Sequence, residues 1–126
     1  MEKAGKVVLV VDDNRDGCEA LAMLLELNGF VVKQANSAEQ ALSVLQSSPV
    51  DLIVTDINMS GMNGFELAKE TLVQGYDMGV VFMSGLPKNE EIFLHLAQQG
   101  VITPKSSFLL KPLSIELLEK AMEELM

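Results

Sequence analysis

The sequence contains no tryptophan, a single cysteine, a single histidine and few aromatic residues of any kind (5%). Because Cys18 is alone, the chain of 126 residues cannot form an internal disulfide, and its place in an apolar helical stripe predicts a small core residue. The histidine, His95, is expected on the surface of a helix. No apolar run is long enough to span a bilayer, and the polar segment 1–6 does not resemble the start of a signal peptide. These absences predict a cytoplasmic protein that does not insert into a membrane.

Basic residues are also scarce. Nine Lys and Arg stand against eighteen Asp and Glu, which gives a net charge of −9. Such a surface repels nucleic-acid backbones and anionic lipids, so no direct binding to nucleic acid is expected. Hydrophobic residues make up 48% of the chain, enough to fill one core. The whole chain, 1–126, is therefore expected to be a single domain with no output domain.

Short aliphatic runs alternate along the chain with segments whose apolar residues recur at helical spacing. Five such pairs predict an α/β fold, a (βα)5 doubly wound five-stranded parallel sheet with helices on both faces. Ser37, Asn89 and Ser114 are expected to cap helices, with Gln40 completing a capping box at Ser37. The strands are expected at 7–11, 30–34, 52–56, 80–83 and 108–110, and the more polar second strand is expected nearer an edge.

Chemically active side chains stand where these predicted strands end. Ligands of open parallel sheets bind beyond the carboxyl ends of the strands. If the strand order is 2-1-3-4-5, the first and third strands are neighbours and their acids share one pocket. The residues that follow or end the strands are Asp12 and Asp13 (first), Asp56 (third), Ser84 (fourth) and Lys111 (fifth).

Three carboxylates in one pocket need a cation. Two unit charges ~4 Å apart repel by about 4 kcal/mol at an effective dielectric near 20. An oxygen-rich site of this kind suits Mg²⁺, which keeps several waters and commonly holds phosphate oxygens as well. Lys111 and Ser84 could then hold further oxygens of a phosphoryl group, with Asp56 as the nucleophile that forms an acyl phosphate. Taken singly, these residues are also typical of N-caps and turns; their joint arrangement favours a site.

The chain resembles, over essentially its whole length, the receiver domain of two-component response regulators. The segments that carry the resemblance are 7–14, 56–67, 84–85 and 108–112. The resemblance implies the flavodoxin-like strand order 2-1-3-4-5. A Thr-Pro-containing stretch within 100–108 is similar to receivers fused to hybrid sensor histidine kinases. The sequence departs from the family at Ser60, where proline is usual, and at Gly85, where alanine is common.

The resemblance also implies a role for each acid. Asp56 would accept a phosphoryl group from a phosphohistidine on a histidine kinase or a histidine phosphotransfer protein. Asp13 would bind Mg²⁺ directly and Asp12 mainly through water, joined by Asp56 and the backbone carbonyl of Asn58. Mn²⁺ is the expected substitute. The domain would catalyse only its own phosphorylation and dephosphorylation, so it is not expected to be an enzyme with an independent substrate.

The remaining implied roles concern the response to phosphorylation. Ser84 and Lys111 would hold the phosphoryl oxygens, and the Lys111–Pro112 peptide bond would be cis. Ser84 and Phe108 would act as switch residues that reshape the face made by the fourth helix, fifth strand and fifth helix, although Phe108 also fits a plain core aromatic. The expected partners are the phosphodonor and a downstream effector or fused output domain. The sequence does not decide whether a homodimer forms on phosphorylation.

Three other functions compete with a phosphorelay module. A Mg²⁺-dependent phosphatase with an aspartyl nucleophile would carry that acid on the first strand and add a cap domain. A flavodoxin-like mononucleotide binder would have a Ser, Thr or Gly phosphate loop where this chain has Asp12 and Asp13. A receiver-like interaction scaffold that is not phosphorylated would not need the complete set of acids.

Overall fold

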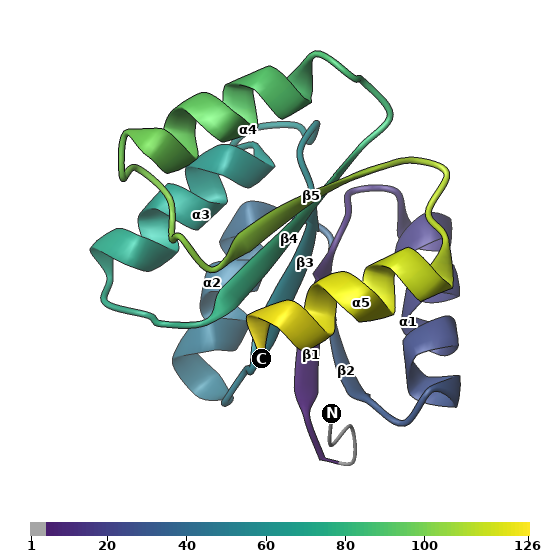
Figure 1. The fold of residues 1–126 in the computed structure, drawn as a ribbon. Coiled ribbons are helices and arrows are strands. Elements are labelled where there is room, and N and C mark those ends of the chain that lie inside the picture. Colours follow the sequence, from purple (N-terminus) through teal and green to yellow (C-terminus); the bar gives the residue numbers. More distant parts are fainter. Residues whose placement is uncertain (1–4) are drawn as a thin grey trace.

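The computed structural model describes residues 5–126, in which five strands alternate with five helices (Figure 1). All strands are parallel, and their order in the sheet is β2-β1-β3-β4-β5, which confirms the predicted fold. The elements are β1 (Val7–Val11), α1 (Arg15–Leu27), β2 (Val31–Ala35), α2 (Ala38–Ser47), β3 (Leu52–Asp56), α3 (Gly64–Val73), β4 (Gly79–Ser84), α4 (Asn89–Gln98), β5 (Ser106–Leu110) and α5 (Ile115–Leu125).

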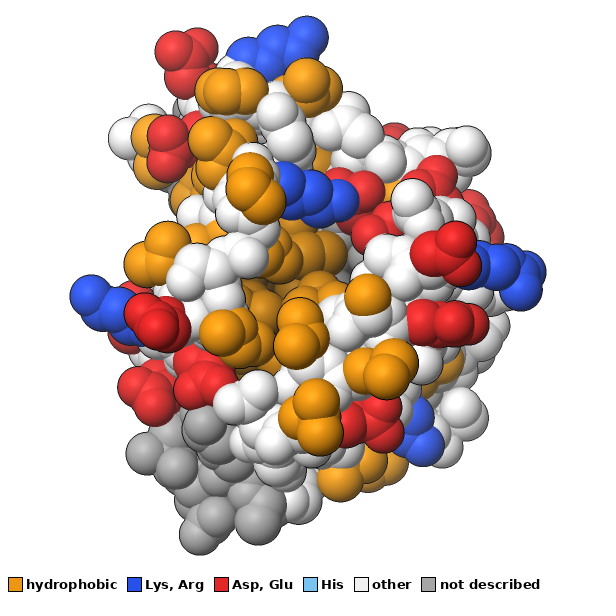
Figure 2. All heavy atoms as spheres, turned by 90° about the vertical axis from the view of Figure 1, so that its right-hand side faces the viewer, with side chains coloured by type: hydrophobic (Ala, Val, Ile, Leu, Met, Phe, Trp, Pro, Cys, Tyr) orange, Lys and Arg blue, Asp and Glu red, His pale blue; other side chains and the backbone are white. Residues whose placement is uncertain are grey.

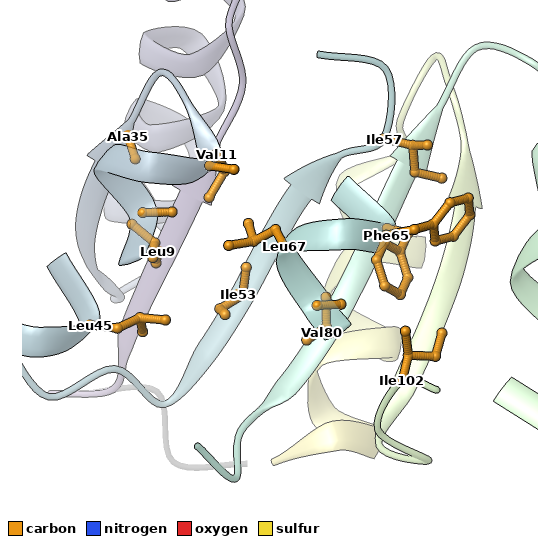
Figure 3. Close-up of a cluster of buried hydrophobic side chains, with 14 of the residues drawn as sticks. Leu9, Val11, Ala35, Leu45, Ile53, Ile57, Phe65, Leu67, Val80 and Ile102 are labelled. Carbon is orange, nitrogen blue, oxygen red and sulfur yellow. The ribbon is translucent and has the colours of Figure 1, made fainter. Parts of the chain in front are cut away.

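The sheet is covered on both faces. Figure 1 shows α2, α3 and α4 on one face and α1 and α5 on the other. Alternate residues of one strand supply the two cores: Ile53 packs on the α2–α3–α4 side, drawn in Figure 3, and Val54 on the α1–α5 side. Each large aliphatic side chain buried in this way stabilises the fold by about 1.5–3 kcal/mol. The central strand β3 is buried at every residue, which explains the aliphatic run with which it begins, residues 52–54.

The edge strands differ from the sequence-based boundaries. β2 lies at one edge as predicted, but it spans residues 31–35, and Phe30 lies before it, buried in the α1–α5 core. β5 begins at Ser106, which pairs with Val80, so Ser106 and Ser107, which lie outside the predicted strand 108–110, belong to the strand. Backbone pairing with β4 is sufficient to extend a half-buried edge strand through polar residues.

β4 is also longer than predicted. It spans 79–84, since Gly79 pairs with Leu52 and Ser84 with Leu110. Ser84 is therefore part of the sheet, at the last rung of the β4–β5 ladder.

Side chains cap four of the five helices, with some corrections to the prediction. Ser37 caps α2 as expected, but Gln40 Oε1 accepts from the N–H of Asn36, one residue before the cap, so the capping box is only half formed. A complete capping box, which the sequence analysis did not identify, joins Asn63 and Glu66 at α3. The other two capped helices are α1, by Asn14, and α5, by Ser114.

The fourth helix starts in a different way. Asn89, predicted as its N-cap, is instead its first helical residue, and Lys88 occupies the cap position without a side-chain hydrogen bond. Asparagine is common at N-caps, where its side-chain oxygen accepts from the helix backbone. The prediction was wrong because the side-chain amide of Asn89 instead donates to Ser84 and Asn58. None of the helices within residues 5–126 has the length and apolar character needed to cross a bilayer.

Candidate functional site

The three predicted acids converge at the carboxyl end of the central strands. Asp12 follows β1, Asp13 is the next residue, and Asp56 ends β3. One carboxylate oxygen from each lies within 4.8 Å of the other two. Val11 pairs with Thr55 in the parallel sheet. Asp12 follows Val11 and Asp56 follows Thr55, so the two acids lie side by side.

Backbone groups hold two of these acids in place. Asp12 Oδ1 accepts from the N–H of Asn14 at 3.0 Å, and Asn36 Nδ2 donates to the Asp12 carbonyl at 3.0 Å. Asp13 Oδ2 accepts from the N–H of Ser60 at 3.2 Å, which joins the β1–α1 turn to the β3–α3 loop. Asp12 and Asp56 are 6% and 9% exposed, whereas Asp13 is exposed. Two buried acids and one exposed acid thus form a cluster that reaches solvent at Asp13.

Lys111 supplies the positive charge. Its Nζ lies 3.4 Å from Asp56 Oδ2 and 3.9 Å from Asp12 Oδ2. Its backbone N–H donates to the Ser84 carbonyl at 2.8 Å, so the ends of β4 and β5 are joined beside the acids. The Lys111–Pro112 peptide bond is cis, as the resemblance implied.

The environment raises the pKa of Asp56. Burial of the carboxyl is the largest cause, and the neighbouring Asp12 charge adds to it, while Lys111 acts in the opposite direction. One lysine therefore does not offset the desolvation and repulsion at Asp56. A divalent cation would supply the missing charge, and three carboxylates around one point have the donor chemistry of a site for a hard cation.

Asp56→Asn is expected to raise the melting temperature at neutral pH. Since the pKa of Asp56 is higher in the folded protein, ionisation of this group destabilises the fold once the pH exceeds the ordinary carboxyl value of 3.8. The neutral amide removes that cost, and its advantage should shrink as the pH falls toward the ordinary value. Thermal unfolding of both proteins without divalent metal, from about pH 4 to about pH 8, measures the difference. A variant less stable than wild type at neutral pH would show that the Lys111 ion pair outweighs burial.

Ser84 ends β4, beside the acids, but its hydroxyl is hydrogen-bonded to groups outside the acid cluster. The side chain is fully buried, and Oγ accepts from the N–H of Leu86 at 2.9 Å and from Asn89 Nδ2 at 2.8 Å. The second hydrogen of the Asn89 amide goes to Asn58 Oδ1 at 2.9 Å. Asn89 thus lies beside the predicted site residues, and sequence reasoning, which assigned it to the N-cap of α4, did not predict its contacts with Ser84 and Asn58.

Phe108 continues a row of aromatic rings across the α2–α3–α4 side of the sheet. It is half-buried, with its ring centroid 6.1 Å from that of Phe93, and the row continues through Phe82 to Phe65. In this structure Phe108 packs against that core.

Two glycines beside the site have opposite surroundings. A Cβ on Gly64 would overlap the carbonyl oxygen of Asp56 and lie 2.9 Å from the Cα of Ile57. A Cβ on Gly85 would meet no atom within 4 Å. The close approach at Gly64 brings the start of α3 directly against the backbone that carries Asp56.

The fold and the acid cluster with its lysine are those of a signalling receiver module. The family model described as the response regulator receiver domain matches residues 8–123, and the chain belongs to that family. Receiver domains of this family are signalling domains of two-component systems and not metabolic enzymes.

Relatives and a solved structure agree with this assignment. The chain is 31% identical over 117 residues to transcriptional regulatory protein ZraR of Escherichia coli K12, covering 93% of the chain and 25% of ZraR. It is 28% identical over 116 residues to sensor histidine kinase RcsC of Escherichia coli, covering 92% of the chain and 12% of RcsC. The chain therefore spans a quarter or less of these two relatives. The response regulator TrrA of Thermotoga maritima, solved with Mg²⁺ and beryllofluoride, superposes with a TM-score of 0.79 at 26% identity, covering 95% and 99% of the two chains.

Proposed function

We propose that this domain accepts a phosphoryl group on Asp56 from a phosphohistidine of a histidine kinase or histidine phosphotransfer protein. The observation that carries the proposal is the position of Asp56, a desolvated carboxylate with a raised pKa, 3.4 Å from the Lys111 ammonium and beside two further acids. A carboxylate in such a place has an unfavourable free charge, which a bound cation would relieve, and its oxygen can act as a nucleophile toward phosphorus.

The acids fit a Mg²⁺ site, with Mn²⁺ as a substitute. Asp13 and Asp56 would bind the ion directly with the backbone carbonyl of Asn58, and Asp12 mainly through water. The bound ion neutralises negative charge that the phosphoryl oxygens bring to the pocket. The relative TrrA, whose solved complex holds Mg²⁺ and beryllofluoride, supports this choice of metal.

The chain's own groups account for the transfer. A carboxylate oxygen of Asp56 forms a bond to phosphorus while the bond from phosphorus to the donor's imidazole nitrogen breaks, and its electron pair returns to the ring. Lys111, which follows β5, lies where it can bind one phosphoryl oxygen, and Ser84 would bind another after its hydroxyl turns. The domain catalyses this step on itself alone, and it likewise catalyses the later hydrolysis, in which water attacks the acyl phosphate, inorganic phosphate leaves and the Asp56 carboxylate is restored.

The modified state would be read at the face made by α4, β5 and α5. Ser84 and Phe108 are the proposed switch residues, because one ends β4 beside the acids and the other lies on β5 against α4. A downstream effector or a fused output domain would bind this face, and a homodimer formed on phosphorylation is a further use of it. We place the domain in the cytoplasm, where histidine kinases and their effectors act.

Two observations disfavour the competing functions. The nucleophile of an aspartyl phosphatase would lie on the first strand, whereas Asp56 ends the third. A scaffold without phosphorylation would not need three converging acids and a lysine, since their mutual repulsion costs stability.

Incubation with Mg²⁺ and acetyl phosphate is expected to add one phosphoryl group to the wild-type domain. The small donor replaces the phosphohistidine, because alignment and neutralisation come from the acceptor's own site. Intact mass spectrometry measures the adduct, which should disappear in base as an acyl phosphate does. Removing the metal with EDTA should prevent its formation, since Asp12, Asp13 and Asp56 would then repel the incoming phosphate. No adduct on the wild type in the presence of metal would refute the proposal.

A further inference from the structure

Asn89 is the only buried Asn or Gln among residues 5–126, with 4% of its surface exposed. Both hydrogens of its side-chain amide are used. One is donated to Ser84 Oγ at 2.8 Å and the other to Asn58 Oδ1 at 2.9 Å. The side chain therefore joins the start of α4 to Ser84, the last residue of β4, and to the β3–α3 loop, which follows Asp56.

The start of α4 depends on these bonds more than the other helix starts do. Its cap residue, Lys88, has helical backbone angles and makes no side-chain hydrogen bond. The backbone contributes a turn in which Leu86 accepts from the N–H of Asn89 and Pro87 accepts from that of Glu90. What holds the first turn of α4 against the sheet is thus the Asn89 side chain.

We propose that Asn89 is a positioning residue that tethers the Ser84 hydroxyl and so sets the cost of turning Ser84 toward a phosphoryl group on Asp56. This inference rests on the proposed phosphorylation of Asp56. In the structure Ser84 Oγ accepts two hydrogen bonds, and it donates to the Leu86 carbonyl oxygen, which lies 3.4 Å from Oγ. No hydrogen bond joins it to Asp56 or Lys111 in the described part of the chain.

Turning the hydroxyl has a consequence for α4. When Ser84 donates to a phosphoryl oxygen, the Asn89 amide loses an acceptor inside the protein, and a buried donor without a partner is unfavourable. The side chain regains a partner only if the first turn of α4 moves with it. Asn89 therefore couples the orientation of one hydroxyl to the position of a helix start.

The test measures affinity for Mg²⁺ and beryllofluoride, a stable mimic of the phosphoryl group. Asn89→Leu keeps a similar size but cannot donate, and it is expected to bind the mimic about three- to tenfold more tightly, the size of one net hydrogen bond. Asn89→Ser, which is too short to reach Ser84, should shift the affinity in the same direction and serves if the leucine variant folds poorly. Glu90→Gln is the matched control, because Glu90 is the next residue of α4 and is exposed.

A second background separates a tether from a general effect on packing. In Ser84→Ala the hydroxyl is absent, so adding Asn89→Leu should change the affinity by less than about twofold. Equal effects of Asn89→Leu in both backgrounds would overturn the proposal. Amide hydrogen exchange of residues 86–91 in the unmodified protein gives a readout that needs no phosphate. Exchange should become faster in Asn89→Leu and stay unchanged in Glu90→Gln.

The outcomes distinguish this proposal from the one on which it rests. A wild type that takes up neither phosphate nor the mimic overturns the proposed function, and the role of Asn89 with it. A competent wild type whose Asn89→Leu variant shows unchanged affinity and unchanged exchange overturns the tether alone.

Discussion

Asp56→Asn is expected to abolish phosphate uptake from acetyl phosphate. The amide has nearly the shape of the carboxylate but is not a nucleophile, so the acyl phosphate cannot form. The expected result is complete loss of the mass adduct, although the fold is kept and its melting temperature at neutral pH is raised. Because the variant folds, loss of the adduct is attributable to chemistry.

Asp16→Asn is the matched control for this experiment. Asp16 is an exposed acid in the first turn of α1, near the same edge of the sheet but outside the acid cluster, and its amide changes the net charge by the same amount. It should take up phosphate at about the wild-type rate. If Asp56→Asn still formed a base-labile adduct, another carboxylate would have to be the acceptor.

Gly64→Ala is expected to be the most destabilising single-methyl addition at the site. The new Cβ would meet the Asp56 carbonyl oxygen and the Ile57 Cα, which are backbone atoms that cannot turn aside. Overpacking of this kind costs about 3 kcal/mol, more than the ~1 kcal/mol that alanine gains over glycine in a helix. Thermal unfolding should show a melting temperature lowered by about 10 °C.

Gly85→Ala is the control for that result. Gly85 is also next to the site, follows Ser84, and has no atom within 4 Å of an added Cβ. Neither glycine has a positive φ, so backbone strain does not distinguish them. Gly85→Ala should change stability by at most ~0.5 kcal/mol. Equal losses in the two variants would mean that the close contact at Gly64 does not limit the fold.

The fold class was predictable because its signals are local. A buried strand such as 52–56 begins with a run of aliphatic residues, and helices carry apolar residues at helical spacing, so alternation of the two appears in the sequence itself. The strand order is different in kind, because crossover helices leave several parallel orders open. It came from the resemblance to the receiver family, and the structure confirms it.

Element ends were less predictable where pairing decided them. Ser106 and Ser107 have turn character, yet their backbone groups continue the ladder beside Val80 and Val81. Phe30 has strong strand propensity, yet it lies before β2, where its N–H donates to the Leu25 carbonyl. Pairing with β4 outweighed the turn preference of the two serines, and the end of α1 outweighed the strand preference of Phe30.

The site was partly predictable for a similar reason. Acids and a lysine that end strands are visible in the sequence, because parallel strands deliver such residues to one edge. The second use of Asn89 was hidden, because asparagine is equally favoured where a helix begins. The contact of Gly64 with the Asp56 backbone was hidden as well, because it exists only after α3 packs.

The hydrogen bond between Ser60 and Asp13 has a consequence for the loop above the acids. Proline, the usual residue at this position in the family, has no amide hydrogen, so it could not make this bond. Serine lacks the stiffness of a proline ring, yet here the carboxylate itself restrains the loop. Part of the entropy cost of fixing this loop is therefore met during folding, before the proposed metal ion would bind.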